Sequence, residues 1–455
     1  MLTFSRRRFS FLPIIVLAAW SIPGASAQNS GSSAARWYKG NLHTHSLWSD
    51  GDDYPEMIAD WYKRNGYNFL GLSDHNVFQE GTRWFELKAP VSFKGEVVQR
   101  GGGVVLDKYL KRFGPDWVEL REKGRNKEVR LKPLAEYRSL LEESGRFLMI
   151  PSEEISANWS TPKTATQPAM SGPVHINVTN PRDVIKALPA DNAFDMMQQT
   201  LNAIAEQQER SGQPMLVHIN HPNWRWGLTV EEMMRVQKER FFEVYNGHPG
   251  VENKGDALHL GMDAMWDVML TFRLTELKLG LVYGIGVDDS HNYHDITLGK
   301  SNPGRGWIMV RARHLTAESI IHAMEAGDFY ASSGVTLNEV KREANRLSVE
   351  IKTEPNVTYT TQFIGTRRGF DPASELMKPP SDDAQLQRTL PHRRYSKDIG
   401  AVLAAVKGAS ASYTFKGDEI YVRAKVVSSK SKPNASVAGE FETAWVQPVA
   451  VVTQK

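Results

Sequence analysis

Residues 41–51 read NLHTHSLWSDG, a segment in which two histidines stand one residue apart and an aspartate follows five positions later. In a β-strand, side chains at i and i+2 point to the same face, so His43 and His45 would direct two imidazoles at one place. Asp50 would lie on the loop just beyond them. The segment therefore indicates the start of a metal site, with a turn-rich surface segment as the alternative. The rest of the chain must decide between these two interpretations.

Short apolar runs alternate with helical patterns from about residue 37 to residue 335. This alternation is typical of βα units and of the α/β fold class. Helices are predicted after Pro55, through LAEYRSLLEES, near 194–210, after Thr229 and over 259–278. Thr229 with Glu232 is predicted to form a capping box at the start of its helix. An insertion at about 79–146 interrupts the pattern. The predicted strands are YKGNLHTHS, YNFLGLSDH, RFLMIPSEEIS, VHINVTN, PMLVHINHP, FFEVYNG and LVYGIGVDDSH.

The sequence pattern changes beyond Gly334. LSVEIK, YVRAKV and TAWVQPV read as strands, whereas residues 369–398 are polar and rich in proline. Residues 340–455 are therefore predicted to form a small β-sandwich-like domain with one long loop, after a barrel at 37–335.

The first 27 residues have the features of an export signal. A twin-arginine pattern, SRRRF at 5–9, precedes the apolar run FLPIIVLAAW and the small residues Ala25-Ser26-Ala27. We expect a cleaved twin-arginine signal peptide at 1–27, a periplasmic or secreted protein, and no stable membrane span after cleavage. An uncleaved membrane anchor is the alternative.

The bulk composition limits the partners and the chemistry. Removing the three arginines of the leader from a formal net charge of +3 leaves a neutral mature chain, which argues against a nucleic-acid partner. The sequence has no cysteine, so any metal site must use histidines and carboxylates.

Ligand-type side chains stand at or near the end of every predicted strand. In a barrel of parallel βα units these ends converge on one face, where active sites are built. Imidazoles and carboxylates suit zinc, manganese and iron, and there are more candidates than one tetrahedral ion needs. Two or three divalent ions of unknown identity are therefore expected. The candidates are His43, His45, Asp74, His75, Glu153, Glu154, His175, His218, His221, Asn246, His248, Asp289 and His291.

These motifs resemble the PHP (polymerase and histidinol phosphatase) superfamily, and within it the exported carbaryl-hydrolase-like metallohydrolases. The resemblance implies a distorted (β/α)7 TIM-like barrel with a di- or trinuclear metal centre at the strand ends. TAWVQPV is similar to part of the β-domain that often follows this barrel in exported relatives. The matching motifs are HTHSLWSDG at 43–51, SDHN at 73–76, PSEEIS at 151–156, HINV at 175–178, NHPNW at 220–224, EVYNG at 243–247 and GVDDSH at 286–291.

The resemblance also implies a division of the metal ligands into three groups. Glu154 would bridge the first ion to the second, and it is preferred to Glu153, just as His221 is preferred to His218. Asp74 would orient His75 or a neighbouring ligand. The implied groups are His43, His45, Glu154 and Asp289 for the first ion, Glu154, His175 and His221 for the second, and Asp50, His75 and His291 for the third.

The chemistry expected from such a centre is attack by a metal-bridging hydroxide on phosphorus or on an activated carbonyl. Asp289 would take the proton, and Glu154 would hold the ions together. His248 and His294 are candidate leaving-group acids. Arg225 could bind a phosphate or carboxylate, with Trp224 and Trp226 as apolar walls. Lys300 and Arg305, in LGKSNPGRG, are expected to be solvated loop charges, with anion ligands as the alternative.

The predicted function is that of an exported metal-dependent hydrolase acting on a small molecule, with a phosphate ester favoured. An amide, carbamate or ester hydrolase on the same centre is the second hypothesis. A non-catalytic, metal-containing binding module is the third. The substrate, the metals, the general acid, the oligomeric state and the role of the C-terminal domain stay open.

Overall fold

The computed structural model describes residues 34–87, 91–93, 96–98, 100–163, 170–377 and 392–451. The predicted signal peptide at 1–27 and part of the predicted loop at 369–398 lie outside these residues. From Ala35 onward the chain forms one compact unit. Within the described ranges, no helix has the length and apolar character that a membrane crossing requires.

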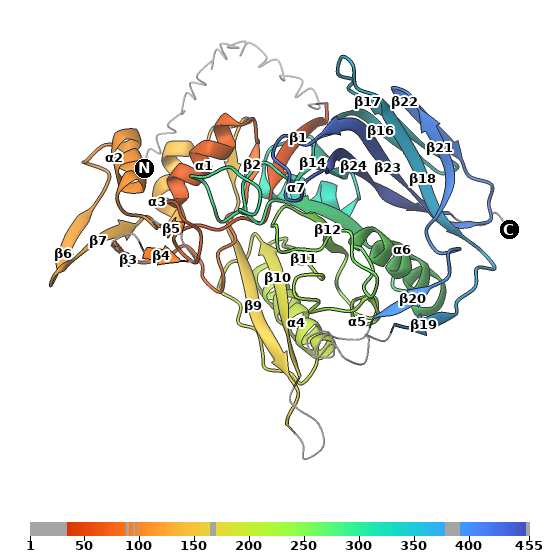
Figure 1. Cartoon of the computed structure of the whole chain (residues 1–455), viewed down its shortest axis with the longest axis horizontal. Coiled ribbons are helices and arrows are strands. Elements are labelled where there is room, and N and C mark those ends of the chain that lie inside the picture. Colours follow the sequence, from red (N-terminus) through yellow and green to blue (C-terminus); the bar gives the residue numbers. More distant parts are fainter. Residues whose placement is uncertain are drawn as a thin grey trace, which may run out of the picture. The chain divides into compact units, whose positions relative to one another are not determined.

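Two sheets build the part of the fold that carries the histidine motifs (Figure 1). In the first sheet, β1 (Arg36–Asn41), β2 (Phe69–Leu70) and β8 (Leu148–Met149) are parallel neighbours. The second sheet has five strands, in the order β13, β12, β11, β10 and β9. Their bounds are β9 Ser152–Ser160, β10 Ser171–Thr179, β11 Leu216–Ile219, β12 Phe241–Asn246 and β13 Tyr283–Val287.

Isolated parallel bridges join the two sheets just beyond the ends of their strands. Thr44, after β1, pairs with Ser290, after β13, and His75, after β2, pairs with Glu154 in β9. These bridges link the strands into a ring at one end. Each bridge lies beside residues predicted as metal ligands.

The architecture is mixed α/β with few helices, and the regular βα alternation expected for 37–335 is only partly present. β10 runs antiparallel to both β9 and β11, and the described residues between β9 and β10 include no helix. The connection between these two strands spans only residues 161–170. A parallel crossover needs about a dozen residues or more, so this short connection can only reverse the chain.

Local sequence signals account for the helices around these sheets. Pro55 stands in the first turn of α1, and Asn192 accepts a hydrogen bond from the Asp195 amide at the start of α4. The predicted capping box of Thr229 and Glu232 is present in α5. The helices are α1 Pro55–Arg64, α4 Ala193–Ser211, α5 Val230–Met233, α6 Met262–Phe272, which continues as the π-helix η1 Arg273–Leu277, and α7 Ala317–Glu325.

The predicted insertion folds as an α+β layer against α1. The Tyr109 hydroxyl and the Trp117 indole donate hydrogen bonds of 2.6 and 3.1 Å to Glu56, and Arg112 pairs with Asp60 at 2.7 Å. These contacts fix the insertion to α1. Its elements are β3 Arg83–Leu87, β4 Val91–Phe93, β5 Glu96–Val98, α2 Val104–Phe113, β6 Leu120–Lys123, β7 Asn126–Leu131 and α3 Leu134–Leu141.

The C-terminal strands form two packed layers around a second apolar core. One layer continues the sheet of β1 through β14, β15, β24, β23, β18 and β21, so strands from both predicted domains share hydrogen bonds. The domain boundary near 335–340 therefore stays a prediction. The remaining bounds are β14 Trp307–Ala312, β15 Phe329–Ser332, β16 Leu337–Glu343, β17 Arg346–Ile351, β18 Tyr359–Arg367, β19 Ser374–Leu376, β20 Arg393–Tyr395, β21 Ala401–Lys407, β22 Ser410–Thr414, β23 Glu419–Ser431 and β24 Phe441–Ala450.

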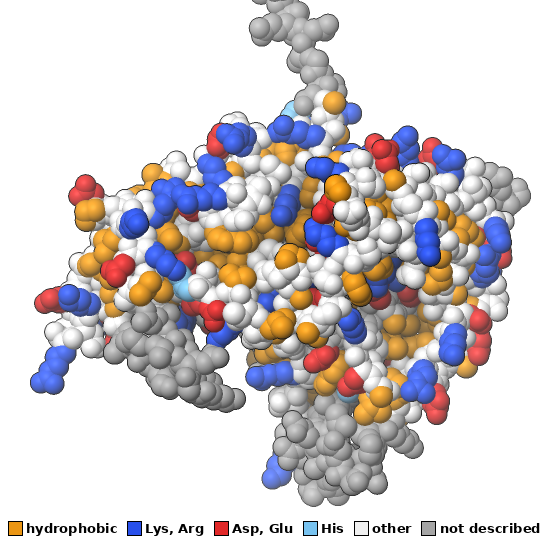
Figure 2. All heavy atoms as spheres, turned by 45° about the horizontal axis from the view of Figure 1, so that its top comes forward, with side chains coloured by type: hydrophobic (Ala, Val, Ile, Leu, Met, Phe, Trp, Pro, Cys, Tyr) orange, Lys and Arg blue, Asp and Glu red, His pale blue; other side chains and the backbone are white. Residues whose placement is uncertain are grey.

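Charged side chains of both signs are intermixed on the face shown in Figure 2. The expectation for Arg305 was wrong, because its side chain is fully buried rather than solvated. Its guanidinium donates to the carbonyls of Gly247 and Thr297 at 3.0 and 3.1 Å. Arg305 thus ties together loops that follow β12 and β13.

The buried Glu56 should make stability depend on pH. Burial raises the pKa of Glu56 to about 7 from its ordinary value of 4.5. Between about pH 4.5 and about pH 7, the folded chain keeps a proton that the unfolded chain loses. The free energy of unfolding therefore falls as pH rises through this range. Glu56→Gln should reduce that fall by about 1–3 kcal/mol, measured by thermal denaturation at about pH 5 and about pH 8.

The exposed Glu318 in α7 supplies the control. Glu318→Gln should leave the pH dependence of the wild-type protein unchanged. An unchanged pH dependence in Glu56→Gln would show that this carboxyl is ionised in the folded state across the window.

Candidate metal centre

The residues predicted as metal ligands converge on the ring of strand ends. His43 and His45 follow β1, His75 follows β2, and His221 follows β11, while Glu154 lies within β9. His175 enters from the antiparallel β10, where it pairs with Ser156. Asp50, Asp289 and His291 complete the set from the loops after β1 and β13.

Four donor atoms form a central group. His43 Nε2 and His45 Nε2 lie 3.2 Å apart, and they lie 3.4 and 3.3 Å from Glu154 Oε2. Asp289 Oδ1 lies 3.3 Å from His43 Nε2 and 3.1 Å from His45 Nε2. A tetrahedron with ligand distances of about 2.05 Å has edges of about 3.3 Å. Each of these five distances is close to that edge, so the two imidazoles have the spacing of ligands that share a divalent ion with Glu154 or with Asp289.

Glu154 faces two groups of imidazoles with its two oxygens. Oε1 lies 2.9 Å from His175 Nδ1 and 3.4 Å from His221 Nε2. Oε2 is buried and accepts no well-directed hydrogen bond from the described residues, although His75 Nδ1 is 2.8 Å away. That nitrogen is instead paired with Ser156 Oγ at 2.6 Å. An orphaned carboxylate oxygen in this position fits a bound cation.

A third group lies toward the surface. Asp50 Oδ1 is 3.3 Å from His291 Nε2, and Asp50 Oδ2 is 3.5 Å from His75 Nε2. The His45 ring stacks between those of His75 and His291, at centroid distances of 4.5 and 4.2 Å. His291 Nδ1 lies 3.0 Å from the Asp289 carbonyl oxygen, which leaves His291 Nε2 free to face Asp50.

Opposing electrostatic effects set the protonation of this cluster. Burial alone lowers the pKa of His43, but Asp289 and Glu154 outweigh it and hold that pKa well above its ordinary value. Burial raises the pKa of Glu154, yet His75 and His43 outweigh it and hold that pKa well below its ordinary value. For His45, burial and repulsion from His291 and His75 lower the pKa to about 4. Ionised carboxylates around the imidazoles favour a positive charge here, which a metal ion can supply in place of a proton.

Glu243, in the interior of β12, is a central residue that the sequence reasoning did not single out. Its Oε1 lies 2.6 Å from His43 Nδ1, and its Oε2 accepts the His221 amide at 2.8 Å. A bond from Nδ1–H to Glu243 turns the lone pair of His43 Nε2 toward the centre. The available signal was a glutamate inside the apolar strand segment FFEVYNG.

The two alternatives left open by the sequence differ clearly in position. His221 lies beside Glu154, whereas His218 lies behind His43, with its Nε2 3.4 Å from Glu243 Oε1. Glu153 turns away from the cluster, and its Oε2 accepts the Ile185 amide at 3.0 Å. The geometry therefore groups Glu154 and His221 with the other candidate ligands.

Asp74 acts on a neighbouring loop rather than on His75. Its Oδ1 accepts the Ser46 amide at 2.8 Å and the Ser49 hydroxyl at 2.6 Å. Its Oδ2 accepts the Gln79 amide group at 2.6 Å. Asp74 thus holds the loop that carries Asp50.

The two tryptophans predicted as apolar walls, Trp224 and Trp226, lie in different places. The Trp224 ring lies 5.1 Å from His175 and 5.5 Å from His221, and the Arg225 guanidinium lies 4.6 Å above the Trp224 ring. Trp226 instead stacks on His259, at a centroid distance of 3.9 Å. Only Trp224 therefore borders the centre.

His248 borders the centre, whereas His294 lies to one side. The His248 ring is 5.6 Å from the His291 ring, and its Nδ1 accepts the Gly250 amide at 3.0 Å. His294 Nδ1 lies 3.3 Å from Lys108 Nζ, on the insertion, and its Nε2 lies 3.5 Å from Asp53. His294 is thus placed between the insertion and the loop after His45.

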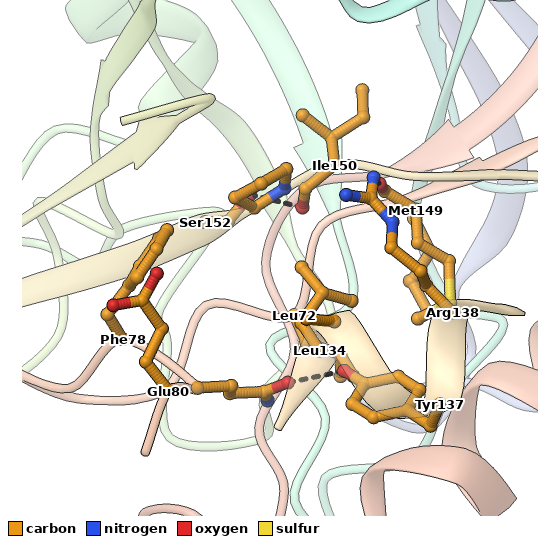
Figure 3. A pocket seen from close by; sticks show the side chains of 13 residues that line it. Leu72, Phe78, Glu80, Leu134, Tyr137, Arg138, Met149, Ile150 and Ser152 are labelled. Carbon is orange, nitrogen blue, oxygen red and sulfur yellow. Dashed lines mark hydrogen bonds between the residues drawn. The ribbon is translucent and has the colours of Figure 1, made fainter. Parts of the chain in front are cut away.

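A cavity of about 110 Å³ lies between β2, β8 and α3, lined among others by Leu72, Phe78 and Tyr137 (Figure 3). The Tyr137 hydroxyl donates to Gln79, the residue that holds Asp74. None of the candidate metal ligands lines this cavity. The cavity therefore lies beside the residues that hold the Asp50 loop, and not at the candidate centre.

Comparisons with known proteins add little to this geometry. No protein-family model matches the sequence, and no curated protein matches it. One similar solved structure is a two-domain protein from Bacteroides vulgatus that contains a predicted PHP-like metal-dependent phosphoesterase. It is 14% identical, with 94% of this chain and 99% of that chain covered, at a TM-score of 0.35. A similarity at this TM-score carries no argument, so the candidate centre is judged on its own donor atoms.

Removing the shared carboxylate should remove metal. Glu154→Gln should lose most of the bound divalent metal, because the amide replaces an anionic donor that faces both imidazole groups. Metal content after dialysis, measured by plasma mass spectrometry, is the readout. Glu153→Gln changes the adjacent buried carboxyl and should keep the wild-type content. Equal metal content in the two variants would contradict the bridging assignment.

Loss of the Glu243 carboxylate should weaken metal binding without removing a ligand. Glu243→Gln leaves every donor atom in place but loosens His43, so metal affinity should fall about 10–100-fold. Competition against a chromogenic chelator measures this affinity. Glu239→Gln, at another buried glutamate just before β12, is the matched control. Wild-type affinity in Glu243→Gln would refute its role in orienting His43.

Proposed function

We propose that this protein is a PHP-type, metal-dependent phosphoesterase that acts on a small molecule. The observation that carries the proposal is the position of Glu154, whose two oxygens face the His43–His45 pair and the His175–His221 pair. A carboxylate shared between two imidazole groups is the arrangement that a site for two adjacent divalent ions requires.

Divalent ions at this position would supply Lewis acidity and an activated water. The chain itself would contribute the proton acceptor, for which Asp289 is the candidate. Its Oδ2 accepts a hydrogen bond of 3.1 Å from Asn246 and lies 3.9 Å from His221 Nε2, so that oxygen is oriented toward the centre. Asp289 is held with a positive φ of 49°, a backbone conformation that is uncommon outside glycine and is found at functional sites.

The residues beside the centre favour an anionic substrate. The Arg225 guanidinium lies on the Trp224 ring and makes no ion pair within the described ranges. A guanidinium can bind a phosphate through two parallel hydrogen bonds. This exposed guanidinium, on a ring that lies 5.1 and 5.5 Å from His175 and His221, supports phosphate esters over neutral amides or carbamates.

His248 is suited to donate a hydrogen bond to such a substrate. Because the Gly250 amide can only donate, the bond of 3.0 Å requires an unprotonated Nδ1 on His248. The neutral ring then carries its proton on Nε2. We therefore assign His248 to substrate binding, with proton transfer to the leaving group as a further role.

Export remains a proposal that rests on the leader sequence at 1–27. Cell fractionation of the full chain and of a variant in which Arg6, Arg7 and Arg8 are replaced by lysine would test it.

Turnover of phosphate esters should depend on metal. The mature chain, reconstituted with manganese, zinc or iron, should hydrolyse aryl phosphate mono- or diesters faster than aryl carbamates and esters. Chelation should abolish this activity, and added metal should restore it. Asp289→Asn should lower kcat by about 10²-fold or more.

The alternative functions predict different results with the same set of aryl phosphate, carbamate and ester substrates. Turnover of carbamates or esters alone would identify the second hypothesis. Absence of turnover with stoichiometric metal bound would identify a binding module.

A further inference from the structure

The loop after His221 has a strained backbone. Arg225 and Trp226 are consecutive residues with φ values of 52° and 53°, although neither is glycine. A non-glycine residue in this conformation is disfavoured and persists only where its surroundings hold it. This loop carries the Trp224 ring and the Arg225 guanidinium to the edge of the candidate metal centre.

Contacts from the barrel side hold one part of the loop. The Trp224 amide donates to the His221 carbonyl at 2.8 Å, and the Asn223 side chain donates to the carbonyls of Glu252 and Leu260 at 2.9 Å each. These bonds fix the backbone up to Trp224. Within the turn, the Trp226 amide donates to the Asn223 carbonyl at 3.3 Å, and the Gly227 amide donates to the Trp224 carbonyl at 3.2 Å.

Trp226 is held by a stack of rings on its outer side. It lies parallel to His259, with a centroid distance of 3.9 Å and an interplanar angle of 8°. His392 meets His259 edge-on, at 4.6 Å and 85°, and lies 6.3 Å from Trp226. His259 is oriented by Asp256, whose Oδ1 lies 2.7 Å from His259 Nδ1. The last ring of the stack thus comes from the C-terminal part of the chain.

His392 contributes as an apolar ring rather than as a polar group. Its residue is 2% exposed, and neither of its nitrogens has a hydrogen-bond partner in the described part of the chain. Burial lowers the pKa of His392 to about 4, so the ring is neutral at neutral pH. Packing is therefore its role.

A second contact anchors the same segment to the barrel. His392 directly precedes β20, and the Tyr395 hydroxyl in β20 donates a hydrogen bond of 2.7 Å to Glu231 in α5 (Figure 1). The ribbon of β19 and β20 is thus attached on both sides of the strained loop.

We propose that His392 is a positioning residue for substrate recognition, which acts through His259 and Trp226 to keep the Arg225 guanidinium beside the metal centre. The inference rests on the proposed function in one respect, namely that Arg225 binds the anionic group of the substrate. It assigns to the C-terminal part of the chain a contribution to specificity, although that part supplies none of the candidate ligands.

Variants of His392 in the full-length mature protein test the proposal. His392→Ala should raise both KM for an aryl phosphate and the Kd for inorganic phosphate about ten-fold, as expected when one charge-assisted hydrogen bond is weakened. Its kcat and metal content should stay within about two-fold of wild type, because no candidate ligand moves. Calorimetry with inorganic phosphate provides the Kd independently of turnover.

A conservative variant and a double mutant separate positioning from general damage. His392→Phe should behave like wild type, because the native ring uses neither nitrogen. In Arg225→Ala protein, adding His392→Ala should cause no further loss of phosphate affinity, since both changes remove the same interaction. His322→Ala, at an exposed histidine in α7, is the control.

Three results would overturn the inference: unchanged phosphate affinity in His392→Ala, equal damage from His392→Phe, or additive losses in the double mutant. A failure of the proposed function would give a different set of results. In that case no ester is turned over, while the phosphate affinities still follow the expected pattern.

Discussion

The carboxylate of Glu154 is fully buried, and it lies within 3.4 Å of nitrogens from His43, His45, His75, His175 and His221. A buried charge with one oxygen free of hydrogen bonds is costly unless a cation compensates it. The imidazoles can provide that compensation as protonated rings or as ligands of shared metal ions. Every other feature of the centre follows from this constraint, since four chain segments must bring nitrogen atoms to one carboxylate.

Two isolated β-bridges and one antiparallel strand pair bring these nitrogen atoms to Glu154. The parallel bridge between His75 and Glu154 closes one side of the ring of strand ends, and the bridge between Thr44 and Ser290 closes the other. The antiparallel pairing of β9 and β10 then places His175 opposite Ser156, beside Glu154. Glu243 stands behind the first imidazole and fixes its orientation through Nδ1. Position and orientation of the donors are thus provided by different strands.

Two outer layers meet the centre without supplying candidate ligands. The insertion docks on α1 through Glu56 and Asp60, and its Lys108 reaches His294. On another side, His392 packs on His259 in the loop after β12, and Tyr395 in β20 bonds to Glu231 in α5. Arg225, with its strained backbone, lies over the Trp224 ring, which borders the imidazoles. Substrate selection at such a centre therefore depends on segments far from the ligand motifs in sequence.

The sequence by itself determined where most strands lie, because their apolar runs are bounded by local turn and cap signals, and it predicted that side chains such as His43 and Glu154 stand near the strand ends. It also predicted the capping box at Thr229. Only the tertiary structure decided the choice between Glu153 and Glu154, the role of Glu243, the direction of Trp226 and the antiparallel course of β10. These depend on which face of a strand meets which neighbour, and on ring contacts between residues such as His259 and His392. A one-dimensional pattern does not specify which individual side chains touch across more than a hundred residues, so packing alone determined these contacts.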